Sequence, residues 1–163
     1  MTGDEMKRKV RLKELIISLA IPLATGALSA LLTKDGMKRF ETISKPPLSP
    51  PGWLFPIVWT ALFILMGIAC YKVWTSQASY PRRERALTLY GIQLAMNFMW
   101  SIIFFTMGMY LAAFIWLLVM LAFIIAATVF FHYIDKNAGK LMIPYIAWST
   151  FAAYLNFGVF LLN

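Results

Sequence analysis

Long apolar runs separated by short charged segments are the dominant pattern along this chain. Asp, Glu, Lys and Arg are absent from residues 15–33, 46–71, 86–134 and 141–163. A helix that crosses a bilayer needs about 20 apolar residues, so three runs supply one crossing each and the longest supplies two. Its turn is expected near Gly108, between Thr106 and Tyr110. The pattern predicts transmembrane helices at about residues 14–33, 53–75, 87–106, 111–133 and 140–162.

The predicted fold is an all-α integral membrane protein, a five-helix transmembrane bundle that forms one domain over residues 1–163. A closed β-barrel also satisfies the backbone in lipid, but it needs alternating polarity, which residues 123–131 lack. The composition agrees, with 61% hydrophobic and 13% charged residues, whereas soluble domains have about 25% charged residues. The basic leader before the first run also resembles a secretory signal, although that run is long enough to span a membrane.

The net charge of +8 does not indicate a nucleic-acid partner, because the bases interrupt apolar runs instead of lining one face. The predicted partner surface is the lipid bilayer. Five spans place 11 of the 15 Lys and Arg residues on the N-terminal side and four on the other. The positive-inside rule then predicts a cytoplasmic N-terminus, with the first loop and the C-terminus outside. With one Cys and one His, neither an internal disulfide nor a metal site is expected.

The predicted spans have no Asp or Glu well inside them. Ion-coupled transport usually depends on such a group, so transport driven by protons or sodium is disfavoured. Phosphate loops and hydrolytic triads are also missing. On the third span, Gln93 and Asn97 share one face, which should look into the bundle because amides in hydrocarbon need partners. Gly91 and Ala95 lie on the opposite face and, as a small-xxx-small pair, predict a homodimer contact.

Aromatic side chains recur at helical spacing on three spans. Each of these spans brings a tryptophan to what can be one interior: Trp59, Trp100 and Trp148. Core packing is the plainer interpretation of any single ring. Together, the rings and the neighbouring amides favour a void with flat walls and a few hydrogen-bonding groups, as in a site for a flat conjugated ligand.

The first loop, predicted at residues 34–52, contains four prolines that favour extended turns over helix. A stiff loop of this length is expected to form a lid over the bundle. Its bases Lys38, Arg39 and Lys45 would then meet the carboxylates of an amphipathic ligand. The alternative is a solvated connector with ordinary surface charges.

Several blocks of residues, in order and on different spans, resemble the tryptophan-rich sensory protein family, also called the translocator protein or peripheral benzodiazepine receptor family. They are the proline loop at 45–51, then Trp53, Phe55, Pro56, Val58, Trp59 and Thr60, then Gln93, Leu94, Asn97, Trp100, Ser101, Phe104 and Phe105, and finally Pro144, Tyr145, Trp148, Phe151, Ala152, Leu155 and Asn156. The resemblance runs from about Phe40 to Asn156. It implies a five-helix bundle, often dimeric, that binds porphyrins and synthetic aromatic ligands below the first loop.

By this resemblance, the expected ligand-binding residues are Trp59, Phe63, Asn97, Trp100, Tyr145, Trp148, Phe55, Trp53, Phe40, Leu48, Lys45 and Phe104. Leu48 stands where the family often carries Trp, and Phe40 where a Tyr is common, so one stacking surface and one hydroxyl are absent. The segment after Asn156 lacks a Tyr followed by a base, so the cholesterol motif of animal members is missing and sterol binding is not predicted.

The leading hypothesis is a membrane receptor or carrier for porphyrins, protoporphyrin IX or haem, that requires no cofactor. The second is a light-dependent porphyrin-degrading activity of the same pocket, in which Trp59 and Trp148 would be the catalytic residues. The third is a non-catalytic membrane interaction module whose aromatic interior is only packing. A bacterial cell membrane is the expected location, and the family leaves the mitochondrial outer membrane as the alternative.

Overall fold

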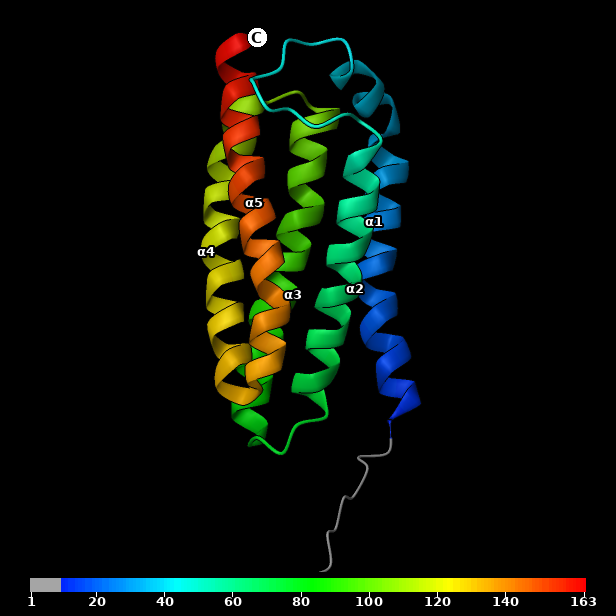
Figure 1. The fold of residues 1–163 in the computed structure, drawn as a ribbon, viewed down its shortest axis with the longest axis vertical. Coiled ribbons are helices and arrows are strands. Elements are labelled where there is room, and N and C mark those ends of the chain that lie inside the picture. Colours follow the sequence, from blue (N-terminus) through cyan, green and yellow to red (C-terminus); the bar gives the residue numbers. More distant parts are fainter. Residues whose placement is uncertain (1–9) are drawn as a thin grey trace, which may run out of the picture.

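Residues 10–163 are described by a computed structural model, and they form five long helices (Figure 1). The bounds are α1 Leu12–Phe40, α2 Leu54–Trp74, α3 Tyr80–Ser101, α4 Tyr110–Ile134 and α5 Lys136–Leu162; a π-helical turn, η1 Ile102–Thr106, continues α3. The five spans are long and apolar enough to cross a membrane, and this part of the chain has no strand. The predicted all-α fold is confirmed, and the chain is a multi-pass membrane protein. The leader bases Lys7, Arg8 and Lys9 lie outside the described residues.

Large apolar side chains are exposed over much of the outer surface of the bundle. On α4, Leu118 and Ile125 are 45% and 44% exposed, while their neighbours Leu117 and Ile124 are fully buried. A soluble protein rarely exposes a continuous apolar face of this kind. The helices therefore present one face to the protein interior and the other to lipid.

The first helix is longer than its apolar run. It was expected to end at Thr33, but it continues to Phe40, so the lid loop covers residues 41–53 instead of 34–52. The charged residues after Thr33, such as Lys34 and Asp35, are exposed, while Gly36 is buried against η1. A charge marks the place where a helix leaves the hydrocarbon, and it does not end the helix.

Two helices also begin earlier in the sequence than predicted. The third helix begins at Tyr80 instead of residue 87, so the Arg triplet at 82–85 lies in its first turns and not in a linker. The fifth begins at Lys136 instead of 140, because the Asp135 carboxylate accepts hydrogen bonds from the backbone N–H groups of Asn137 and Ala138 at 2.8 and 2.9 Å. This carboxylate satisfies N–H groups that a helix start leaves without partners.

The tight turn between the third and fourth spans lies where the sequence placed it. Gly108 adopts a φ of +64°, in the left-handed region that side chains disfavour. The preceding helix ends at Thr106, and α4 starts at Tyr110.

The helices form a closed ring in which α1 packs on α2, α2 on α5, α5 on α4, α4 on α3, and η1 returns to α1. Close approach requires small residues, as at Gly67, where an added Cβ would lie 2.8 Å from the Ser18 carbonyl oxygen. The first loop and the C-terminus lie at the same end of the bundle (Figure 1).

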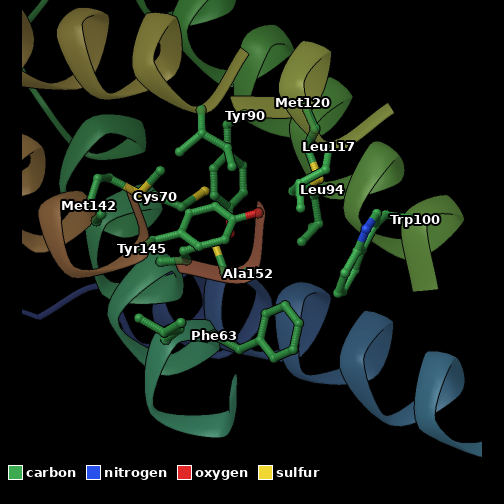
Figure 2. Close-up of a cluster of buried hydrophobic side chains, with 14 of the residues drawn as sticks. Phe63, Cys70, Tyr90, Leu94, Trp100, Leu117, Met120, Met142, Tyr145 and Ala152 are labelled. Carbon is green, nitrogen blue, oxygen red and sulfur yellow. The ribbon is translucent and has the colours of Figure 1, made fainter. Parts of the chain in front are cut away.

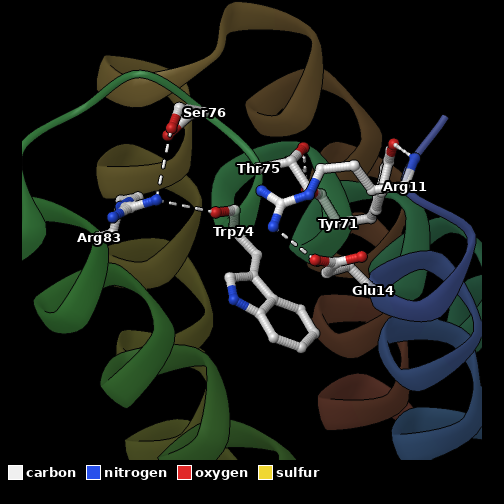
Figure 3. A network of polar contacts seen from close by, with 7 residues as sticks. All are labelled: Arg11, Glu14, Tyr71, Trp74, Thr75, Ser76 and Arg83. Atoms are coloured by element: carbon white, nitrogen blue, oxygen red, sulfur yellow. Dashed lines mark hydrogen bonds and ion pairs between the residues drawn. The ribbon is translucent and has the colours of Figure 1, made fainter. Parts of the chain in front are cut away.

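Polar contacts fix the opposite end, where α1 begins and α2 turns into α3 (Figure 3). Arg11 pairs with Glu14, and the Arg11 backbone N–H donates to the Tyr71 hydroxyl at 3.1 Å. The guanidinium of Arg83 donates to the carbonyl oxygen of Trp74 at 3.1 Å, which satisfies a carbonyl at the end of α2.

Candidate ligand-binding site

A cavity of about 490 Å³ lies in the half of the bundle nearer the first loop, between α1, α2, α3 with η1, and α5. Its size is typical of sites for small molecules. Its wall is mainly apolar and aromatic. The lining residues are Leu23, Gly26, Ala27, Ser29, Ala30, Thr33, Met37, Phe40, Glu41, Gly52, Phe55, Pro56, Trp59, Thr60, Phe63, Asn97, Trp100, Ser101, Phe104, Phe105, Ala152, Leu155 and Asn156.

Trp59 of α2 is the centre of the aromatic wall. Its ring centroid lies 5.7 Å from that of Phe63 and 6.3 Å from that of Trp100 on α3. The Trp100 ring in turn stacks on Phe104, with centroids 5.5 Å apart. The wall therefore presents connected π surfaces from two helices, as expected for a site that receives a flat ring.

A buried hydrogen-bond network fixes the floor of the cavity. The Asn97 amide donates to the Tyr145 hydroxyl at 3.0 Å, and this hydroxyl donates to the Gln93 side-chain oxygen at 2.7 Å. Figure 2 shows Tyr145 of α5 within a cluster of buried side chains that includes Phe63 of α2 and Leu94 of α3. Gln93 and Asn97 do face the interior, as their shared helical face predicted. Because each amide is held by a partner, the floor has one defined arrangement.

A second pair of hydrogen bonds holds the other amide of the wall. The indole N–H of Trp100 donates to the Asn156 side-chain oxygen at 3.1 Å, and the Asn156 amide donates to the Tyr110 carbonyl oxygen at 2.8 Å. These bonds join α3, α5 and the start of α4 beside the cavity. The orientation of the Trp100 ring is therefore set by hydrogen bonding as well as by packing.

The π-helical turn η1 shapes the upper wall. It contains Phe104 and Phe105, two consecutive rings that both line the cavity. The wider turn of a π-helix, which is frequent at functional sites, accommodates both. Phe40 at the end of α1 contacts them, with centroid distances of 5.6 and 5.5 Å.

Two residues of α1 clamp this turn. The Arg39 guanidinium donates to the carbonyl oxygens of Thr106, at 2.9 Å, and Phe105, at 3.4 Å. Gly36 packs so closely that an added Cβ would lie 2.0 Å from the Phe105 carbonyl oxygen. The end of α1 therefore fixes the position of the η1 rings.

Seven of the twelve predicted site residues line the cavity, and they come from α1, α2, α3 and η1. Those that do are Phe40, Phe55, Trp59, Phe63, Asn97, Trp100 and Phe104. Tyr145 and Trp148 of α5 do not. Tyr145 lies behind Trp59, at a centroid distance of 6.2 Å, and Trp148 packs edge-on against Phe55 at 6.0 Å. These two rings support the wall from behind instead of forming its surface.

The predicted site residues of the first loop do not line the cavity either. Leu48 is 81% exposed and has a φ of +66°, and Trp53, just before α2, is 66% exposed. The Lys45 ammonium donates to the Glu41 carbonyl oxygen at 3.1 Å and lies 5.1 Å from the centroid of the Phe40 ring. The loop side chains thus turn outward or back onto the end of α1.

Three contacts between α5 and the first loop form a latch. The Tyr154 hydroxyl donates to the Pro47 carbonyl oxygen at 2.8 Å. Asn163 exchanges two hydrogen bonds with the backbone of Ser44, at 3.1 and 2.9 Å. Between them, Gly158 packs against the Pro46 ring. The loop is held over the bundle by these contacts.

Apart from Phe40, sequence reasoning missed the contribution of α1, which supplies a whole side of the cavity. Its lining residues follow helical spacing and are mostly small, as in Gly26, Ala27 and Ala30. An added Cβ at Gly26 would overlap the Phe63 ring, so a larger residue there would force that ring to shift. In the sequence, the signal that could have identified this side of the cavity was a stripe of small residues on one face of the first helix.

Among the described residues, the cavity wall carries no cluster of metal ligands. Within residues 10–163, no three His, Cys, Asp or Glu side chains cluster as metal ligands would. Besides apolar groups, the side chains available to a ligand are rings, amides and hydroxyls, with the Met37 thioether and the Glu41 carboxylate.

Comparison with known proteins identifies relatives that match most of the chain. The model of the TspO/MBR family matches residues 18–162. Tryptophan-rich protein TspO of Chlorobaculum tepidum is 37% identical over 150 residues, which cover 91% of this chain and 95% of the relative. Tryptophan-rich sensory protein of Cereibacter sphaeroides is 37% identical over 142 residues, covering 87% and 84%. Translocator protein of Bos taurus is 31% identical over 139 residues, covering 84% and 82%.

Proposed function

The chain belongs to the TspO/MBR family, and from this premise we propose that it is a membrane receptor or carrier whose cavity binds porphyrins, either protoporphyrin IX or haem, and other flat aromatic molecules. Family membership supports a membrane sensory or translocator role. The observation that carries the proposal of a ligand is the cavity of about 490 Å³ with connected rings along its wall. Core packing alone leaves no such space.

The porphyrin would be held by stacking of its ring and not by coordination of a bound iron. Each aromatic contact contributes about 0.5–1.5 kcal/mol beyond the burial of area. Iron needs an axial ligand such as His, Cys, Met or Tyr, and among the described lining residues only Met37 belongs to these types. We therefore expect metal-free protoporphyrin to bind at least as tightly as haem.

Light-dependent degradation of the porphyrin is the second candidate function. It is favoured by Trp59, whose indole lines the cavity and neighbours both Trp100 and Tyr145. Trp59 would exchange an electron with the excited ring, or react with the oxygen species that the ring makes. Trp148 touches Phe55 and does not line the cavity, so its part in such chemistry would be indirect.

A homodimer through α3 is part of the proposal. An added Cβ at Gly91 would meet nothing within 4 Å, and Ala95, one turn later, is exposed. A second copy of the helix can therefore approach this face closely.

We place the N-terminal end of the bundle in the cytoplasm. The described bases at that end are Arg11, Lys13, Lys72, Arg82, Arg83, Arg85, Lys136 and Lys140, whereas those at the other end are Lys34, Lys38, Arg39 and Lys45. The bacterial cell membrane is the proposed location, and the mitochondrial outer membrane is the alternative. A reporter fused after Asn163 should be active outside the cytoplasm, and a cytoplasmic signal would contradict this orientation.

Titration of the purified protein with protoporphyrin IX tests the function. Binding should shift the Soret band and quench Trp emission. Trp59→Phe should weaken binding about fivefold, the equivalent of about 1 kcal/mol, and Trp148→Phe should weaken it less. Trp74→Phe, at the far end of α2, is the matched control and should bind normally. An unshifted Soret band and unquenched emission at saturating ligand would leave only the interaction module.

Illumination of the complex separates the two ligand-binding functions. A receptor or carrier should consume the porphyrin no faster than the Trp59→Phe, Trp148→Phe double variant does. A degrading activity should bleach the Soret band faster in the wild type, with both proteins loaded to the same occupancy.

A further inference from the structure

A second pocket lies at the end of the bundle opposite the first loop, where α2 turns into α3. Its volume is about 380 Å³. None of its lining residues lines the aromatic cavity, so the two sites are separate. The residues that line the second pocket are Trp74, Tyr80, Arg83, Glu84, Leu87 and Thr88.

The second pocket lies at the depth of the lipid headgroups. The charge-free runs 46–71 and 86–134 mark the parts of α2 and α3 that cross the hydrocarbon. Trp74 comes three residues after the first run and Arg83 three residues before the second. Trp and Tyr are enriched at this level of a membrane, and Tyr80 is 68% exposed there. The groups around the pocket can therefore contact a lipid headgroup.

Two opposite charges line the second pocket without pairing with each other. Arg83 is half-buried and Glu84 is exposed. The only ion pair within residues 10–163 joins Arg11 and Glu14, so neither charge of the pocket is neutralised by a side chain in contact. A ligand that carries a negative and a positive group can satisfy both.

The guanidinium of Arg83 is held in place with donors to spare. Its Nη1 donates to the carbonyl oxygens of Trp74 and Ser76, at 3.1 and 3.5 Å (Figure 3). A guanidinium has five N–H groups, so those on Nε and Nη2 are available to a ligand. The first turn of α3 contains no acid, and the start of a helix carries partial positive charge. This side of the pocket therefore favours a phosphate, which arginine binds well.

The other charged residues at this end of the bundle do not line the second pocket. At 100° per residue, Arg82 and Arg85 project about 160° and 100° around α3 from Glu84. The bases outside the pocket outnumber the acids and strengthen the attraction for a phosphate, while Glu84 is the one acid placed to contact an ammonium group. Those outside residues are the bases Arg11, Lys13, Lys72, Arg82, Arg85, Lys136 and Lys140, with Glu14, which pairs with Arg11, and Asp135, which caps α5.

We infer that the second pocket binds the headgroup of a zwitterionic phospholipid with a primary ammonium group, as in phosphatidylethanolamine. Arg83 contacts the phosphate and Glu84 the ammonium, which has three N–H donors for the carboxylate. The rings of Trp74 and Tyr80 flank the headgroup, and an acyl chain continues along Leu87 into the hydrocarbon. The inference concerns a lipid and is independent of the proposed porphyrin site.

Three phospholipids with identical acyl chains test the inference. They are phosphatidylethanolamine, phosphatidylcholine, whose trimethylated ammonium donates no hydrogen bond, and phosphatidylglycerol, which has no cation. Each is titrated into the purified protein in a nonionic detergent, and native mass spectrometry measures the bound fraction. The wild type should bind phosphatidylethanolamine about two- to fivefold more tightly than phosphatidylcholine, as expected for an exposed charge contact. Because these two lipids have the same net charge, the surrounding bases do not produce the difference.

Variants assign the two contacts. Glu84→Gln should abolish the preference for phosphatidylethanolamine over phosphatidylcholine and strengthen phosphatidylglycerol about two- to fivefold. Arg83→Gln should weaken all three lipids by a similar factor, because they share the phosphate. Arg85→Gln is the matched control, since Arg85 is an exposed base of α3 that does not line the second pocket. It should leave the binding of the two lipids without net charge unchanged.

Equal binding of phosphatidylethanolamine and phosphatidylcholine to the wild type would overturn the headgroup site, and so would a preference that survives Glu84→Gln. The second pocket borders the Gly91 face of α3. A change in the dimer fraction of Glu84→Gln with unchanged lipid preference would therefore assign the pocket to a second copy of the chain and overturn the lipid site. Arg83 also holds the turn after α2, so thermal melting is measured for each variant. Glu84→Gln alters an exposed side chain and should melt like the wild type.

Discussion

The guanidinium of Arg39 donates a 2.9 Å hydrogen bond to the carbonyl oxygen of Thr106. This contact joins the end of α1 to the last residue of η1, although the two residues lie 67 positions apart. Because η1 carries Phe104 and Phe105 into the cavity, the shape of the ligand wall depends on a side chain outside it.

Replacing Arg39 with Gln should loosen η1. The carbonyl oxygens of Phe105 and Thr106 lose a charged donor, which costs about 1 kcal/mol at this exposed position. Trp100 stacks on Phe104, so its emission should shift as well. Thermal unfolding and Trp fluorescence measure both effects, and Arg39→Lys should recover part of them. Emission and melting identical to the wild type in Arg39→Gln would contradict the clamp.

Gly36→Ala should be strongly destabilising. The added methyl would lie 2.0 Å from the Phe105 carbonyl oxygen, which is backbone and yields only if α1 and η1 separate. A cost of about 1–3 kcal/mol is expected, as for other overpacked sites. Gly91→Ala is the control, since a Cβ at Gly91 meets nothing within 4 Å. Thermal melting of the two variants side by side decides the matter, and equal melting temperatures would argue against tight packing at Gly36.

The homodimer should depend on the size of residue 91. Gly91→Leu places a bulky side chain on an open face of α3, where it leaves the fold of one protomer intact but keeps two helices apart. Cross-linking or native mass spectrometry should show a shift from dimer to monomer, with normal porphyrin binding. A dimer unaffected by Gly91→Leu would place the interface on another helix.

Tyr145→Phe should destabilise the floor of the cavity. Its hydroxyl accepts from Asn97 and donates to Gln93, so its removal leaves two buried amides short of a partner. Such a loss costs about 1–3 kcal/mol. Tyr154→Phe removes one exposed hydrogen bond to Pro47 and should cost less. Unfolding in denaturant compares the two, and the reverse order would refute the assigned network.

The number and order of the spans followed from the sequence because hydrocarbon excludes charge, so the absence of charged residues marks a crossing directly. The inward face of α3 followed for a related reason, since Gln93 and Asn97 need partners that lipid does not offer. Both side chains are buried and hydrogen-bonded.

The helix ends and part of the candidate site could not be predicted from the sequence. Outside the hydrocarbon a charged residue is compatible with helix, and α1 therefore continues past Lys34 to Phe40. The residues that line the cavity from α1 are small, such as Gly26 and Ala30, and they matter through the space they leave. The resemblance to a family marked large rings, so it included Trp148, which supports Phe55 from outside the cavity.

The hydrogen bonds of the latch between the end of α5 and the first loop are made to the main chain of the loop. Tyr154 and Asn163 make three hydrogen bonds to the backbone of Pro47 and Ser44, and none of the three uses a loop side chain. Exposed positions such as Leu48 can thus change in evolution without loss of these hydrogen bonds, whereas a change at Tyr154 or Asn163 weakens the attachment of the loop. New ligand preferences can arise in the loop while its attachment is inherited unaltered.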